Sequence, residues 1–120
     1  MSEVTTPLID LESQQAQGEH WIRMAEHVDR LRQNPDFQKL ILEEFGVHEA
    51  ARYIAFSGDM KQPTDVRADA LAMAQAPGHL MRFLVITKQK AHMAMAQREE
   101  LRQAIDQEAG DVDDANEFET

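Results

Sequence analysis

The sequence of 120 residues predicts an all-α protein of four to five helices, forming a helical hairpin or bundle with a long C-terminal helix. The first observation is composition, because helix-favouring residues are common while the chain has only 5 Gly and 4 Pro. The second is that apolar residues recur at intervals of three and four, which is the spacing of one helix face. The third is a strong helix start at residues 34–37, Asn-Pro-Asp-Phe.

Residues 34–37 begin the best-defined of the expected helices. Asn34 is a good N-cap, and Pro35 suits the first turn, where its missing N–H would have no partner anyway. Asp36 then lies at the positive end of the helix dipole. Gly46 is expected to end this helix as its C′ residue. Three apolar residues at the i, i+3, i+4 spacing are expected to share its buried face: Phe37, Leu40 and Ile41.

Turn residues bound the other expected helices. A first helix covers residues 18–33, a third covers about 47–56, and a short fourth begins at Thr64. Pro and Gly at 76–78 are expected to break the fourth helix, so that a long last helix covers about 77–107. The apolar stripe of the first helix consists of Trp21, Met24, Ala25, Val28 and Leu31.

Both ends are expected to lie outside a helical domain of residues 19–107. Residues 1–18, interrupted by Pro7 and Gly18, are interpreted as an irregular N-terminal arm. This arm is either a floppy terminus or a short segment that orders on docking to a neighbour. Residues 108–120 are interpreted as an acidic disordered tail. The acidic residues that define this tail are Asp111, Asp113, Asp114, Glu117 and Glu119.

The formal net charge of −10 resides mostly at the ends of the chain. Residues 1–11 contain two acidic residues, residues 108–120 contain six, and neither segment contains Lys or Arg. Subtracting these eight charges leaves −2 for residues 12–107. Because a DNA or RNA reader needs a basic surface, we expect no direct nucleic-acid binding. The tail is a solvating end, a docking element for a basic partner, or a mimic of nucleic-acid charge.

The sequence lacks the residue patterns on which several kinds of catalytic and metal site depend. The chain has no cysteine, which excludes disulfides and Cys-ligated metals. His20 and His27 are seven residues apart and form no His-x-x-x-His pair. The sequence also has no nucleophile elbow and no phosphate-binding Gly-rich loop. We therefore expect no enzyme activity and no catalytic, cofactor or metal site. We also expect no signal peptide and no transmembrane segment.

The last helix is expected to carry a surface for self-association. Residues 80–86 are apolar nearly all round, which requires burial on several sides. A homo-oligomer is the simplest cover for so much apolar surface in a short chain. The residues of this expected partner surface are Leu80, Met81, Leu84, Val85, Ala91, Met95, Leu101 and Ile105.

The stretch of residues 21–102 resembles a group of small helical proteins encoded by tailed bacteriophages. In that group an Asn-Pro-Asp-Phe helix start is followed by an apolar helix, an Ala-Arg-rich helix, a variable loop and a long terminal helix. The resemblance covers about two-thirds of the chain and transfers no catalytic residues. The acidic extension at the C-terminal end has no match in the group. The residues that carry the resemblance are Leu31, 34–37, 40–42, 49–52 and 80–86.

This resemblance implies a non-enzymatic structural or assembly accessory protein of a phage particle. Such a protein would self-associate and dock to a larger capsid, portal or tail component, and it would be located in the virion or the host cytoplasm. One alternative is a small acidic phage inhibitor of a host enzyme or defence complex. Another is a small terminase-like DNA-packaging subunit, which would require salt-sensitive DNA binding.

Overall fold

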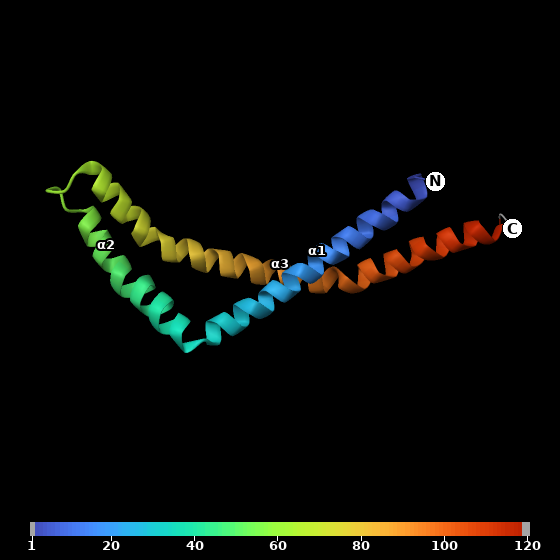
Figure 1. Cartoon of the computed structure of the whole chain (residues 1–120), viewed down its shortest axis with the longest axis horizontal. Helices are drawn as coiled ribbons and strands as arrows, with labels where there is room; N and C mark the ends of the chain where they lie inside the picture. The colour runs from blue at the N-terminus through green and yellow to red at the C-terminus, as the bar shows by residue number, and fades with distance from the viewer. Residues whose placement is uncertain (1, 119–120) are drawn as a thin grey trace. The chain divides into compact units, whose positions relative to one another are not determined.

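The computed structural model describes the backbone of residues 2–118 and the side chains of residues 7–111. Its elements, in chain order, are α1 (Ser2–Gln33), the π-helix η1 (Phe37–Glu49), α2 (Ala50–Ser57) and α3 (Thr64–Phe118). Figure 1 labels α1, α2 and α3. No strand occurs in this described part of the chain, which confirms the all-α class. The expected number of four to five helices is wrong, because η1 continues directly into α2 and the described backbone therefore forms three continuous helices.

The chain forms two compact units. Unit 1 comprises residues up to 25 and from 87 onward, and unit 2 comprises residues 26–86. Unit 1 therefore contains most of α1 and the C-terminal part of α3. Unit 2 contains the end of α1, η1, α2, the loop of residues 58–63 and the start of α3. Each unit has its own buried apolar cluster.

In unit 1, α1 and α3 pair antiparallel. Ile22 and Ala25 pack on Ala91, whereas the earlier residue Gly18 lies against the later residue Ala94. Residues on α1 that are buried or half-buried recur at alternating intervals of three and four, as in a coiled-coil seam. These are Leu8, Leu11, Gln15, Gly18, Ile22 and Ala25. Along α3, the buried or half-buried residues at the same spacing are Thr87, Ala91, Ala94, Leu101, Ile105 and Glu108, and the exposed Arg98 lies between Ala94 and Leu101.

In unit 2, the buried cluster joins the end of α1 to η1 and α3. Val28, Phe37 and Leu84 are its buried members. Four half-buried residues pack around them: Ile41, Leu42, Leu80 and Met81. Phe37 of η1 and Leu84 of α3 are far apart in the sequence, and the cluster packs these two helices against a common core.

The junction between α1 and η1 is built by side-chain caps. The Asn34 Oδ1 accepts hydrogen bonds from the backbone N–H of Asp36 at 2.9 Å and of Phe37 at 3.1 Å. The backbone carbonyl of Asn34 accepts the first helical bond, from the N–H of Gln38 at 3.0 Å. The Gln38 Nε2 in turn donates to the carbonyl of Arg32 at 2.6 Å, near the end of α1. Asn34 therefore makes the N-cap bonds that its side chain suits.

The winding of η1 changes which residues face the core. A π-helix bonds i to i+5 and has about 4.4 residues per turn, so each residue advances roughly 80° instead of about 100°. From Phe37, this winding turns Leu42 inward and Leu40 outward. Leu42 is half-buried in the unit 2 cluster, whereas 62 % of Leu40 is exposed. Of the expected buried face, Phe37 is buried and Ile41 is half-buried, but the expectation for Leu40 is wrong.

Gly46 does not end a helix, because η1 continues through it into α2 and no described glycine has a positive φ. A Cβ at Gly46 would lie 3.1 Å from the carbonyl oxygen of Ile41 and 3.9 Å from the Cβ of Pro77. Pro77 itself is buried within α3, which runs through it unbroken. The proline removes one backbone bond, and its packing against Gly46 offsets part of that loss.

The expected N-terminal arm is also helical. Residues 2–18 belong to α1, and a Cβ at Gly18 would meet the Cβ of Ala94 at 3.2 Å. Gly18 is therefore a contact position and not a boundary. The helix is favoured here because Leu8 and Leu11 are half-buried and continue the seam of unit 1.

The expected acidic disordered tail of residues 108–120 is helical as far as Phe118. Once a helix is nucleated, each further residue adds a backbone bond at little cost, and the acidic residues do not stop it. Residues 119 and 120 lie outside the described residues. Among the described helices, none combines the length and the apolar character that crossing a membrane would require.

Candidate interaction surface

The structure divides the expected partner surface among three environments. Leu84 and Ala91 are 3 % and 2 % exposed, so they belong to the chain's own cores and are not available to a partner. Apolar spacing along the last helix could not show whether Leu84 and Ala91 are buried by the chain's own helices or by a partner chain. Val85 and Met95 are 45 % and 51 % exposed, which leaves them open to a partner. Ile105 is half-buried on the unit 1 seam.

The other expected surface residues line grooves. Leu80 and Met81 line an apolar groove of about 400 Å³ in unit 2, together with Ile41, Leu42 and Pro77. Leu101 lines a different groove, in unit 1. Of the expected acidic tail, Asp111 is exposed on α3. The remaining four acidic side chains lie outside the described side chains: Asp113, Asp114, Glu117 and Glu119.

The unit 1 groove runs between α1 and α3 and has a volume of about 290 Å³. Its lining combines a glycine, an aromatic ring, apolar side chains and amides: Gly18, Trp21, Met93, Ala94, Gln97 and Leu101, with Lys90, Gln14 and Gln17. Met93 is 62 % exposed, which is more than most apolar side chains of its size in a folded domain. The groove is therefore open to solvent and partly apolar.

A cation–π contact shapes one wall of this groove. The Lys90 Nζ lies 4.1 Å from the centroid of the Trp21 ring. His20 meets the same ring edge-on, with centroids 5.1 Å apart. Contacts of the Lys90 type contribute about 0.5–1 kcal/mol at exposed sites. Lys90 is thus held against the groove wall while its charge stays at the surface.

An ion pair joins the two helices of unit 1 beside the groove. The Arg98 Nε donates to Glu19 Oε1 at 2.8 Å, and Arg98 Nη2 donates to Glu19 Oε2 at 3.0 Å. The bidentate geometry fixes the orientation of both side chains. Because the Arg98 and Glu19 side chains are 49 % and 37 % exposed, water screens the pair and its stabilising effect is small.

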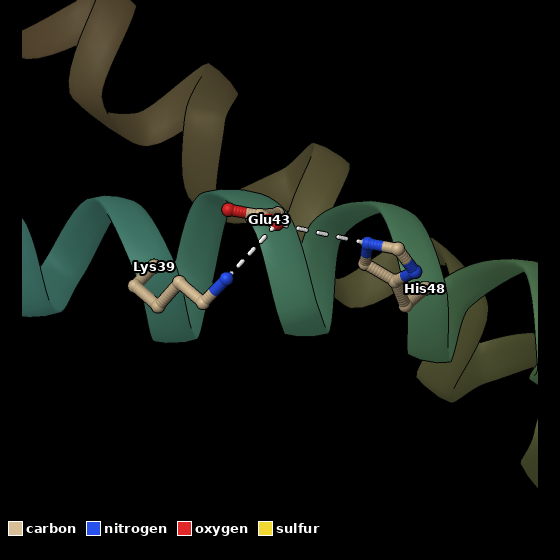
Figure 2. A network of polar contacts seen from close by, with 3 residues as sticks. All are labelled: Lys39, Glu43 and His48. Carbon is tan, nitrogen blue, oxygen red and sulfur yellow. Dashed lines mark hydrogen bonds and ion pairs between the residues drawn. The ribbon is translucent and has the colours of Figure 1, made fainter.

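A second polar group lies on η1, where Figure 2 shows Lys39, Glu43 and His48. The Lys39 Nζ is 3.2 Å from Glu43 Oε1, and the His48 Nε2 is 3.9 Å from the same oxygen. Glu43 and His48 are five residues apart, a separation that the π winding brings to one side of the helix. All three side chains are at least half exposed, so the group is a solvated surface feature.

Charge is distributed unevenly along the part of α3 that belongs to unit 1. Residues 87–98 contain three basic residues and no acidic one. Residues 99–111 contain five acidic residues and one basic residue. The change of sign occurs within one helical turn, between Arg98 and Glu99. This surface therefore has a basic half and an acidic half along a single helix.

Of the residues that line the unit 1 groove, Leu101 was named from the sequence as part of a partner surface, and the others were missed. Trp21 was placed on the apolar stripe of the first helix, and Met93 was not named among the expected surface residues. The available signal was the alternation of three and four residues that includes Gly18, Ile22 and Ala25, which predicts a seam with a close helix approach. The change in charge sign along residues 87–111 was a second signal.

Within the described residues, no group of three or more His, Asp or Glu side chains could hold a metal ion. Comparison of the chain with protein-family models, with curated proteins and with solved structures finds no match.

Proposed function

We propose that this chain is a non-enzymatic structural or assembly accessory protein of a tailed phage particle. It would act by self-association and by docking to a larger virion component such as a capsid, portal or tail protein. The phage context rests on the sequence resemblance of residues 21–102. The docking mechanism rests on the surface described above.

The observation that carries the docking mechanism is the exposure of large apolar side chains on regular helices. Val85, Met93 and Met95 are each at least 45 % exposed on α3. Leu40 and Val47 on η1 are 62 % and 60 % exposed. Single exposed apolar residues are ordinary, but repeated ones along rigid helices favour burial against another protein. A second copy or a larger assembly would supply that cover.

Light scattering coupled to size exclusion, at low and high salt and at two protein concentrations, tests self-association. We expect a defined oligomer that persists at high salt, because apolar burial does not depend on charge screening. A monomer under all these conditions would overturn self-association. It would favour the acidic inhibitor instead, for which deletion of residues 108–120 should abolish inhibition.

Mass spectrometry of purified phage particles and of their assembly intermediates tests the phage context. We expect the chain in one of these fractions, at a copy number that is a multiple of its oligomeric state. Its absence from particles and from all assembly intermediates would overturn the phage role. That result would leave the self-association measurement intact.

A further inference from the structure

We propose that a second copy of the chain packs into the unit 1 groove in an antiparallel orientation, so that the two paired hairpins form a four-helix arrangement. This inference rests on the self-association proposed above and specifies its surface and its orientation. It places Met93 at the interface and pairs Lys90 of each copy with Glu100 of the other.

The first argument is the weakness of the seam inside unit 1. Its central positions are small, with Gly18 and Ala94 in close approach and Ala25 packed on Ala91. Small residues let two helices approach but bury little apolar area. Helices gain most of their stability from packing an apolar face, so this hairpin needs further cover. The groove beside the seam is where that cover can be added.

The second argument is which residues share the open face of α3. Lys90, Met93, Gln97 and Glu100 follow at the i, i+3, i+7 and i+10 positions, which lie on one side of a helix. The first three line the groove directly. Glu100 is exposed, and within the described residues it makes no ion pair. This face therefore has a basic end, an apolar middle and an acidic end.

The third argument is charge complementarity, which selects a second copy in one orientation. In a parallel pair of these faces, Lys90 would meet Lys90 and Glu100 would meet Glu100. In an antiparallel pair with a two-fold axis level with Met95, Lys90 meets Glu100 of the second copy at both ends. Met93 then lies opposite Gln97 of the second copy. Such pairing fixes orientation more than it raises affinity.

A charge-reversal series tests the pairing, with dissociation of the oligomer measured by sedimentation. We expect Lys90→Glu and Glu100→Lys each to weaken association by roughly tenfold, because each change creates two like-charge contacts. The double variant Lys90→Glu/Glu100→Lys should return to within about threefold of the parent. Single variants without effect, or a double variant as weak as the singles, would overturn the antiparallel pairing.

A matched pair of methionine variants tests the surface. Met93→Asp should weaken association by roughly a hundredfold, because Met93 lies at the centre of the interface. Met60→Asp is the control, because Met60 is 78 % exposed but lies in the loop of residues 58–63 and does not line the groove. We expect it to retain the parent oligomer. A Met93 variant that also retains the parent oligomer would overturn this surface while leaving self-association intact.

Spin labels give a test that does not depend on affinity. The chain has no cysteine, so single cysteines can be introduced at the exposed positions Gln97 and Gln107. In the antiparallel pair, residue 97 of one copy is offset along the helix axis from its equivalent by about 6 Å, and residue 107 by about 36 Å. We expect a much longer distance for label 107. Equal distances at the two positions would indicate a parallel pair and would overturn the proposal.

Discussion

The winding of η1 can be tested by comparing two neighbouring leucines. An α-helix that starts at Asn34 would place Leu40 beside Phe37 and turn Leu42 toward solvent. The π winding does the reverse, and Leu42 packs against the cluster of Val28, Phe37 and Leu84. Truncating each leucine to alanine removes the same atoms and barely changes helix propensity. The two variants therefore differ mainly in how deeply the truncated leucine side chain was buried.

The expected magnitudes follow from that burial. Leu→Ala in a core costs about 2–5 kcal/mol, and the half-buried Leu42 belongs near the lower end, at about 2 kcal/mol. Leu40 is 62 % exposed, so less than half of the roughly 1.5–3 kcal/mol for full burial applies to it. We expect Leu40→Ala to lower the free energy of unfolding by about 1 kcal/mol at most. The loss for Leu42→Ala should be about twice as large.

The assay is urea unfolding followed by far-ultraviolet circular dichroism, with both variants and the parent at two protein concentrations. The two concentrations separate a loss of folding stability from a loss of association. If the free energy of unfolding falls with urea concentration at the same slope in all three proteins, the same amount of surface is exposed on unfolding in each. Equal losses, or a larger loss for Leu40→Ala, would refute the π winding and support an ordinary α-helix in this segment.

Five further variants address the cap, the inter-helix ion pair and the glycines, each by the same unfolding measurement. Asn34→Ala should lower the free energy of unfolding by about 1 kcal/mol, because two backbone N–H groups lose their acceptor. Asn34→Asp should leave the free energy of unfolding unchanged, because the Asp carboxylate can accept the same two bonds. Glu19→Gln should lower it by at most about 0.5 kcal/mol at low salt, and a difference that persists at 1 M salt would contradict a screened ion pair. Gly78→Ala should raise it by roughly 0.5–1 kcal/mol, since a Cβ there meets nothing within 4 Å. Gly46→Val should instead lower it by more than about 1 kcal/mol, because its side chain would meet the Ile41 carbonyl and Pro77.

Local signals in the sequence predicted the features that depend on neighbouring residues. The helical character follows from composition and propensity, and the start at Asn34 follows from capping chemistry. The end of α2 at Ser57 and the start of α3 at Thr64 follow from the turn residues between them. Each of these features requires no knowledge of what packs on the helix.

The missed features depend on contacts between distant segments. Gly46 and Pro77 were interpreted as breaks because each disfavours a helix locally. Their side-by-side packing, across more than thirty residues of sequence, allows both helices to continue. Gly18 was misinterpreted for the same reason, since its partner Ala94 is still farther along the chain. Likewise, apolar spacing fits both α and π winding, so it could not assign Leu40 to the surface.

The same dependence on distant contacts explains which surface residues could be found. Val85 and Met95 were named from the apolar character of the last helix, and their exposure leaves them available. Leu84 and Ala91 were named on the same grounds, but their partners within the chain bury them. Trp21 and Lys90 come together only when α1 and α3 pair. A groove is a property of two helices, so a search along one helix does not find it.

The seam of unit 1 links its fold to the proposed association. A larger residue at Gly18 would bury more apolar area, but it would also separate α1 from α3 and alter the groove lined by Trp21 and Met93. The close approach of the two helices keeps those side chains at the surface. Because the hairpin buries little of its own area, stability gained from a second copy would be a large fraction of its total. Folding of unit 1 and docking of the second copy would then draw on the same contacts, which is the behaviour expected of an assembly component.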